Sequence, residues 1–181
     1  MIDTKLAYVT NGALQDATNA RAYGDAVAGC LGQDSALDKL RSVVQEGYAS
    51  KSNAIASPYA ACFLPAFVDK TGVSGLFANR FVSDQGEYAY EGRVYDKADA
   101  TALAGFILGC VDTLKADSEQ AAASDKRIDA AALEKCAKAA ISTDYLRDKF
   151  LVNQLLGRTK QAEAAARTSA ASFQRCVDAQ K

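Results

Sequence analysis

Apolar residues recur along this chain at intervals of three and four positions, and very little interrupts the pattern. Alanine, the residue with the highest helix propensity, occurs 37 times among 181 residues, whereas proline occurs twice. β-Branched runs, which favour strands, are scarce. The sequence therefore predicts an all-α fold of six to eight helices, with at most a short strand near residues 87–95.

Helical periodicity and turn signals divide the chain into separate elements. The predicted helices cover residues 14–31, 35–48, 57–65, 73–82, 98–114, 125–141, 143–156 and 159–178. We expect Gly32 to end the first of them and Pro65 to end the third, since proline is unfavourable within a helix. Ser57 and Pro58 are expected to begin that third helix. Residues 116–124 are expected to form a polar link.

The same pattern predicts an irregular assembly of two pseudo-repeated helical halves. Gly29-Cys30 and Gly109-Cys110 end similar apolar segments, and Cys62 and Cys136 occupy corresponding positions in the two halves. The predicted domains are an N-terminal helical half (1–70), an extended joint rich in glycine and aromatic residues (71–97), and a C-terminal helical half (98–181). Chance agreement explains the repeat equally well.

Charge and composition exclude several function classes. The 21 Lys and Arg residues balance 22 Asp and Glu residues, so there is no basic excess that would favour nucleic acid. No apolar run reaches the roughly 18 residues of a membrane span. The chain contains no histidine, which removes Ser-His-Asp and Cys-His catalysis, and we expect a non-enzymatic protein. Residues 1–5 do not begin a signal peptide, so we expect either a cytoplasmic protein or one that has lost a presequence.

The five cysteines are the only group of residues in the sequence that suggests a specific chemistry. Their spacing fits neither a zinc site nor a CxxC redox motif. Three interpretations remain: free thiols buried in the core, disulfides that leave one thiol unpaired, or separate covalent anchors for a prosthetic group. The candidate anchors are Cys30, Cys62, Cys110, Cys136 and Cys176.

Charged residues near these cysteines suit a linear tetrapyrrole. Such a pigment needs a thiol to bond, a carboxylate for its protonated pyrrole nitrogens and cations for its propionates. Asp25 precedes Cys30 and Asp112 follows Cys110, so these two carboxylates are the candidate acidic partners. Lysines flank Cys136 on both sides. The alternative is that all these charges belong to solvated helix faces.

Cysteine-bearing helices in two related halves, rich in Ala and Tyr and without His, resemble the γ-type linker subunits of red-algal phycoerythrin. The resemblance implies a covalently bound bilin of the phycoerythrobilin or phycourobilin type on the five cysteines. It also implies a phycobiliprotein α/β hexamer as partner. The location it implies is the phycobilisome on the stromal face of the chloroplast thylakoid.

The chain departs from the α and β phycobiliprotein subunits because Cys136 is followed by Ala137, Lys138 and Ala139, not by the Cys-x-Arg-Asp signature. Two functions are therefore predicted. The first is a non-enzymatic, bilin-carrying linker that organises phycobiliprotein hexamers for light harvesting. The alternative is a colourless helical adaptor, or structural subunit of a larger complex, with cysteines buried in its core.

Overall fold

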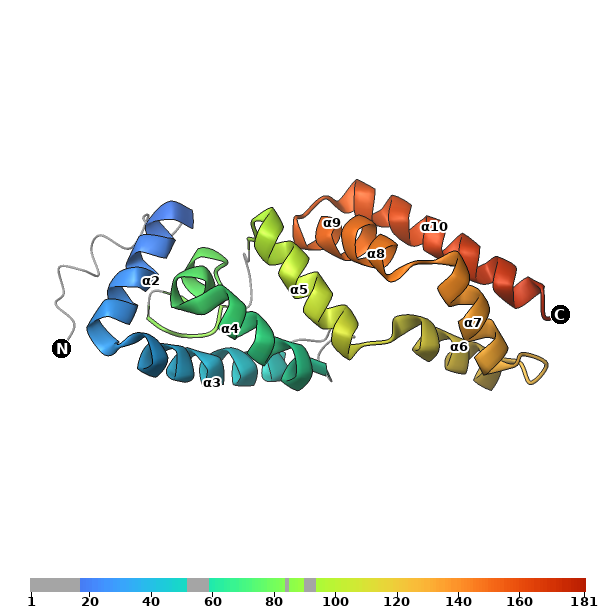
Figure 1. Ribbon diagram of the computed structural model, residues 1–181, viewed down its shortest axis with the longest axis horizontal. Coiled ribbons are helices and arrows are strands. Elements are labelled where there is room, and N and C mark those ends of the chain that lie inside the picture. Colours follow the sequence, from blue (N-terminus) through green and yellow to red (C-terminus); the bar gives the residue numbers. More distant parts are fainter. Residues whose placement is uncertain (1–16, 52–58, 84, 90–93) are drawn as a thin grey trace. The chain divides into compact units, whose positions relative to one another are not determined.

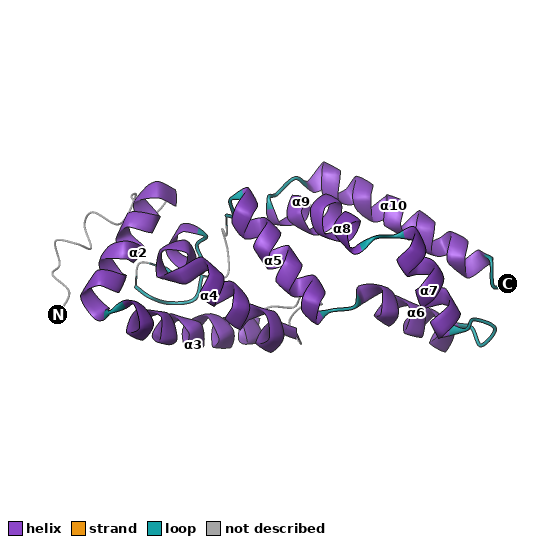
Figure 2. Ribbon diagram, in the orientation of Figure 1, coloured by secondary structure: helices purple, strands orange, loops and turns teal. Residues whose placement is uncertain are grey.

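The computed structural model describes residues 17–51, 59–83, 85–89 and 94–181, and every regular element among them is a helix (Figures 1 and 2). The predicted all-α fold is confirmed, with eight helical segments in these residues when the continuous run 143–155 counts as one. In place of the expected strand, the described residues hold one isolated bridge between Val82 and Tyr88. Ser57 and Pro58, the predicted helix start, lie outside the described ranges. None of the described helices has the length and apolar character needed to cross a membrane.

The chain divides into two compact units, one up to Ala102 and one from Leu103. The described helices of the first unit are α2 (Ala17–Leu31), α3 (Gln33–Lys51), α4 (Ala60–Ala78) and the start of α5 (Lys97–Cys110). Gly32 separates α2 from α3 with a φ of +81°, as the sequence predicts. Residues 71–97, which were expected to form a joint between two halves, fall within this first unit. The predicted repeat between the two halves stays a prediction.

Helix α4 supplies most of the core of the first unit. Its large buried side chains are Phe63, Leu64, Phe67, Val68, Val73, Leu76 and Phe77. The helix passes through Pro65, so the prediction that it ends there is wrong. The φ of proline is compatible with a helix, and apolar burial offsets the one lost hydrogen bond. The chain bends instead at Gly72, whose φ of +68° suits glycine.

Aromatic residues on both sides of α4 complete this core. The rings of Tyr23 and Phe77 pack edge to face with centroids 5.1 Å apart. Phe81 lies 5.2 Å from Phe67 and 5.9 Å from Tyr95. These rings, including Tyr95 of the expected joint, thus contribute to packing of the core.

The second unit begins within α5 and continues through shorter helices. They are α6 (Thr113–Ser124), α7 (Ala130–Ala140), α8 (Thr143–Tyr145), the π-helix η2 (Leu146–Leu151), α9 (Val152–Leu155) and α10 (Thr159–Asp178). The expected polar link at 116–124 is therefore wrong, since these residues are helical. The side chain of Asp112 accepts a hydrogen bond from the Lys115 amide, and the alanines that follow sustain the helix.

Two small apolar clusters contribute to the core of the second unit. Ile128 and Leu133 meet Cys176 and Val177 in one cluster. The other contains Leu114, Ala137 and Ile141. Phe173 of α10 packs against both clusters, so this half-buried ring connects them.

Close contact between α2 and α4 depends on Gly24, which is buried. A Cβ atom at this position would lie 2.5 Å from Ser74 Cα and 3.2 Å from the ring of Phe77. The absence of a side chain therefore lets the two helices approach. Gly29 in the same helix is exposed, and a Cβ atom there would meet nothing within 4 Å, so Gly29 has no such role.

Gly24→Ala and Gly29→Ala should shift stability in opposite directions. We expect Gly24→Ala to lower the free energy of unfolding by about 1–3 kcal/mol, because the backbone of α4 must move away. Gly29→Ala should raise it by about 0.5–1 kcal/mol, because alanine favours the helix and meets no neighbour. Urea unfolding of both variants measures the difference, and equal shifts would contradict the proposed contact.

Candidate functional site

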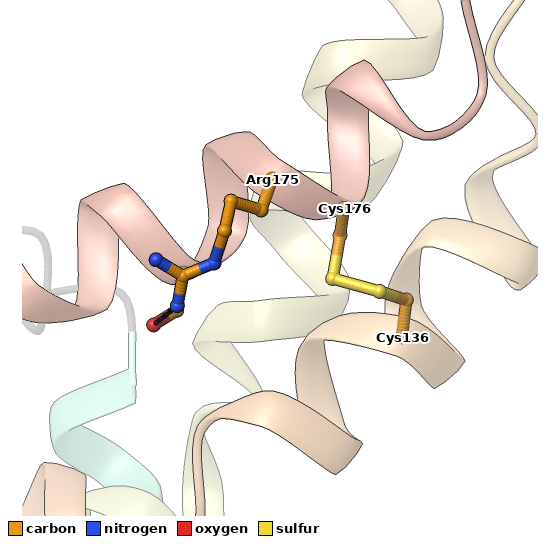
Figure 3. Close-up of a disulfide and its surroundings, with 4 residues drawn as sticks. Cys136, Arg175 and Cys176 are labelled. Carbon is orange, nitrogen blue, oxygen red and sulfur yellow. Dashed lines mark hydrogen bonds between the residues drawn. A yellow bond between two sulfur atoms is a disulfide. The ribbon is translucent and has the colours of Figure 1, made fainter.

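A disulfide between Cys136 and Cys176 joins α7 to α10 (Figure 3). The two Cα atoms lie 5.8 Å apart, within the usual range for a disulfide, and the residues are 40 positions apart in sequence. Cys176 is 4% exposed and belongs to the cluster around Leu133, whereas Cys136 is half-buried at its edge. The bond therefore joins a buried residue of the core to a less buried residue at its edge.

Local structure brings the two sulfur atoms together. The carboxylate of Asp129 accepts hydrogen bonds from the amides of Ala131 and Ala132, at 2.8 and 3.1 Å, and so begins α7. This start places Leu133 and Ala137 in the core and Cys136 beside them. In Figure 3 the side chain of Arg175 extends away from the disulfide, and its guanidinium donates to Ser172 Oγ at 2.9 Å.

The other cysteines differ in state. Cys62 and Cys110 are disulfide-bonded, whereas Cys30 is an exposed free thiol. A sulfur atom in a disulfide carries no thiol and cannot form a thioether. In the structure Cys62, Cys110, Cys136 and Cys176 are therefore neither free core thiols nor thioethers, and bilin anchoring at these positions stays a prediction. Of the three interpretations, disulfides with one thiol left over match the structure.

The two carboxylates proposed as pigment partners have partners within the protein. Asp25 on α2 accepts a hydrogen bond from Ser74 Oγ on α4. Asp112 accepts from the Lys115 amide at 3.1 Å and from Lys138 Nζ at 2.6 Å. The hydrogen bond from Lys138 is the main cause that lowers the pKa of Asp112. Both carboxylates thus connect helices, and Asp112 also caps α6.

Lysine side chains beside Cys136 were expected to meet propionates. Lys138 instead lies 2.6 Å from both Asp112 and Glu134, and these hydrogen bonds raise the pKa of its ammonium group. Lys135 is exposed. The structure therefore places one of the two expected cations in an ion-pair network between α7 and the start of α6.

A polar cluster in the first unit is absent from the sequence-based prediction. The side chain of Asn79, 2% exposed, donates to Asp99 at 2.6 Å, and Arg21 donates to Asp96 at 3.0 Å and to Asp99 at 3.3 Å. Asp96 also accepts from the Asp99 amide and begins α5. The Asp-x-x-Asp spacing is the sequence signal for this helix start. The members of the cluster hydrogen-bond to one another, and because they come from three elements, the cluster connects α2, the end of α4 and the start of α5.

Metal ligation has no support within the residues that the structure covers. No three side chains of cysteine, aspartate or glutamate come together there in a way that could hold an ion. Comparison with protein-family models, curated proteins and solved structures finds no match to this chain. The cysteines therefore provide the main chemical information about function.

Asp112→Ala should destabilise the second unit more than Asp112→Asn. Alanine removes the cap of α6, which we expect to cost about 1 kcal/mol, whereas asparagine keeps a capping oxygen and loses only the charge. Urea unfolding monitored by circular dichroism gives both values. Equal losses would assign the stabilising effect to the ion pair with Lys138 and not to the cap.

The turn before α7 gives a pH-dependent prediction. Arg127 donates to both carboxylate oxygens of Asp125, at 3.0 and 2.7 Å, and this lowers the pKa of Asp125 from 3.8 to about 2. Because the pKa of Asp125 is lower in the folded state than in the unfolded chain, its ionised carboxylate stabilises the fold at pH values above the ordinary pKa of 3.8. This stabilisation is lost as the pH falls toward the folded-state pKa of about 2. Carboxyl chemical shifts in an NMR titration should show the low value.

Arg127→Gln should return the pKa of Asp125 most of the way to its ordinary value in the same titration. Lys126→Gln is the matched control, because it removes an equal charge one residue away without removing these hydrogen bonds. A pKa that moves equally in both variants would mean that general charge, and not the paired hydrogen bonds, lowers it.

Proposed function

We propose that this chain is a non-catalytic helical adaptor or structural subunit that is stabilised by disulfides and works in an oxidising compartment. The Cys136–Cys176 disulfide between α7 and α10 is the observation that carries this proposal. Disulfides persist in oxidising compartments and are rare where thiol systems keep cysteines reduced. The disulfide-bonded state of Cys62 and Cys110 gives further support.

A structural role also agrees with how the charged side chains are used. Asp112 and Lys138 pair with each other, as do Asp125 and Arg127, and both carboxylates begin or bound helical turns. Their shifted pKa values follow from these pairs, which is the pattern of ion-pair networks more than of catalytic groups. The sequence contains no histidine to act as general base near pH 7.

The bilin-bearing linker, with its phycobiliprotein partner and chloroplast location, stays a prediction of the sequence. Of its five candidate anchors, Cys30 is the one that carries a free thiol in the structure, and it is exposed on α2. Four thioether bonds elsewhere would require that the disulfides be absent in the pigmented protein. The adaptor proposal requires no such change, so we favour it.

Counting thiols by mass spectrometry distinguishes the two functions. The natively isolated protein is unfolded and alkylated, with and without prior reduction. We expect one alkyl group without reduction and five after it, and a peptide that joins Cys136 to Cys176. Cys30→Ser is the control and should show none before reduction.

Other masses would reject the proposal. Five alkyl groups without reduction would mean that the natural protein carries no disulfide. A mass increase equal to one or more bilins, retained after unfolding, would favour the light-harvesting linker. Size-exclusion chromatography of the same native preparation tests the subunit role, because elution as a monomer would contradict membership of a stable complex.

A further inference from the structure

Helix α10 buries few large apolar side chains. Its buried residues are Ala162, Ala165, Ser172, Cys176 and Val177. Alanine and serine contribute little apolar area, so most of the apolar contact of this helix is made by Val177, the half-buried Phe173 and the disulfide itself. The attachment of α10 to α7 therefore depends strongly on the covalent bond between them, whereas η2 and α9 also pack against α10.

The residues that pack against α10 from the other helices are more apolar than α10 itself. Ile128 and Leu133 contact its last turn, and Tyr145 and Leu146 pack near Phe173 through the second cluster. One further tie is polar: the amide of Asp129 donates to Gln180 Oε1 at 2.8 Å. If α10 moved away, these apolar side chains would become accessible to solvent.

We propose that the Cys136–Cys176 disulfide is a redox switch whose reduction releases α10 from α7 and exposes this apolar surface. Cys136 is the less buried of the two residues, since it is half-buried whereas Cys176 is 4% exposed, so attack is expected at Cys136. The inference goes beyond the proposed adaptor function, and its test needs no partner.

The step balances with a dithiol as reductant. A thiolate of the dithiol attacks Cys136 Sγ and forms a mixed disulfide, and Cys176 leaves as a thiolate that takes up a proton. The second thiol of the reductant then attacks its own mixed-disulfide sulfur and releases Cys136. The reductant becomes a disulfide, and the protein gains two electrons and two protons as two thiols.

Hydrogen exchange measured by mass spectrometry tests the switch in the full chain. Cys30→Ser is the starting background, because it removes the free thiol. Dithiothreitol is the probe, and alkylation of parallel samples shows which cysteines are reduced. We expect exchange in α10 to become about tenfold faster or more, while α6 keeps its protection, and we expect reoxidation to restore protection of α10.

Two variants assign the effect to this disulfide. Cys136→Ala combined with Cys176→Ala, without reductant, should reproduce fast exchange in α10 while Cys62 and Cys110 stay oxidised. Arg175→Ala changes the residue next to Cys176 but leaves the bond intact, and it should leave exchange in α10 within about twofold of the parent.

Three results would overturn the proposal. The first is unchanged protection of α10 after confirmed reduction of both cysteines. The second is loss of protection in α6, α7 and α10 together, which would make the bond a structural requirement of the whole unit. The third is failure of dithiothreitol to reduce this disulfide while the protein stays folded.

Discussion

One covalent bond compensates for a thin apolar core in the second unit. Among the largest fully buried side chains, the first unit holds Phe63, Phe67 and Phe81, whereas the second holds Leu133 and Ser118. A crosslink between residues 40 positions apart stabilises a fold by about 3–4 kcal/mol in the chain-entropy model, because it restricts the unfolded chain. The disulfide therefore adds substantially to the small apolar cluster that packs α7 against α10.

Disulfide bonding also changes which covalent bonds the cysteines can form. A chain with several well-separated thiols suits covalent pigment attachment, and this is how the sequence resembles a bilin-bearing linker. Once sulfur atoms pair with each other, they hold helices together and cannot form a thioether until the disulfide is reduced. The carboxylates at positions 25 and 112 follow the same rule, since both are used to connect or cap helices.

Periodicity predicts long amphipathic helices well and close contacts poorly. The bounds of α10 agree with the predicted range 159–178, and helical spacing also predicts a face that contains Ala162, Ala165, Cys176 and Val177, which are buried. In α2, helical spacing predicts that Cys30 and Leu31 lie on the apolar face, yet both are exposed and Gly24 is buried. A search for large apolar residues misses Gly24, because its role is to be small where α4 approaches.

Contacts between residues that are far apart in the sequence could not be predicted from the sequence either. Nothing local connects Cys136 with Cys176, or Asn79 with Asp99, because each contact depends on how helices cross. The odd number of cysteines did predict that disulfides would leave one thiol over, and Cys30 is that residue. Capping is local, so the start of α6 could have been predicted from Asp112, which the sequence instead placed inside a helix over 98–114.

The π-helix η2 makes one stretch of the chain tolerant of changes in length. A π turn holds one residue more than an α turn, so loss of one residue within Leu146–Leu151 would convert it to α-helix and leave the flanking faces in place. Loss of one residue between Leu133 and Cys136 would instead rotate the sulfur by about 100° around α7, away from its partner. Deletion of a single residue is therefore expected to be tolerated within η2 and to separate the two sulfur atoms when it falls in α7.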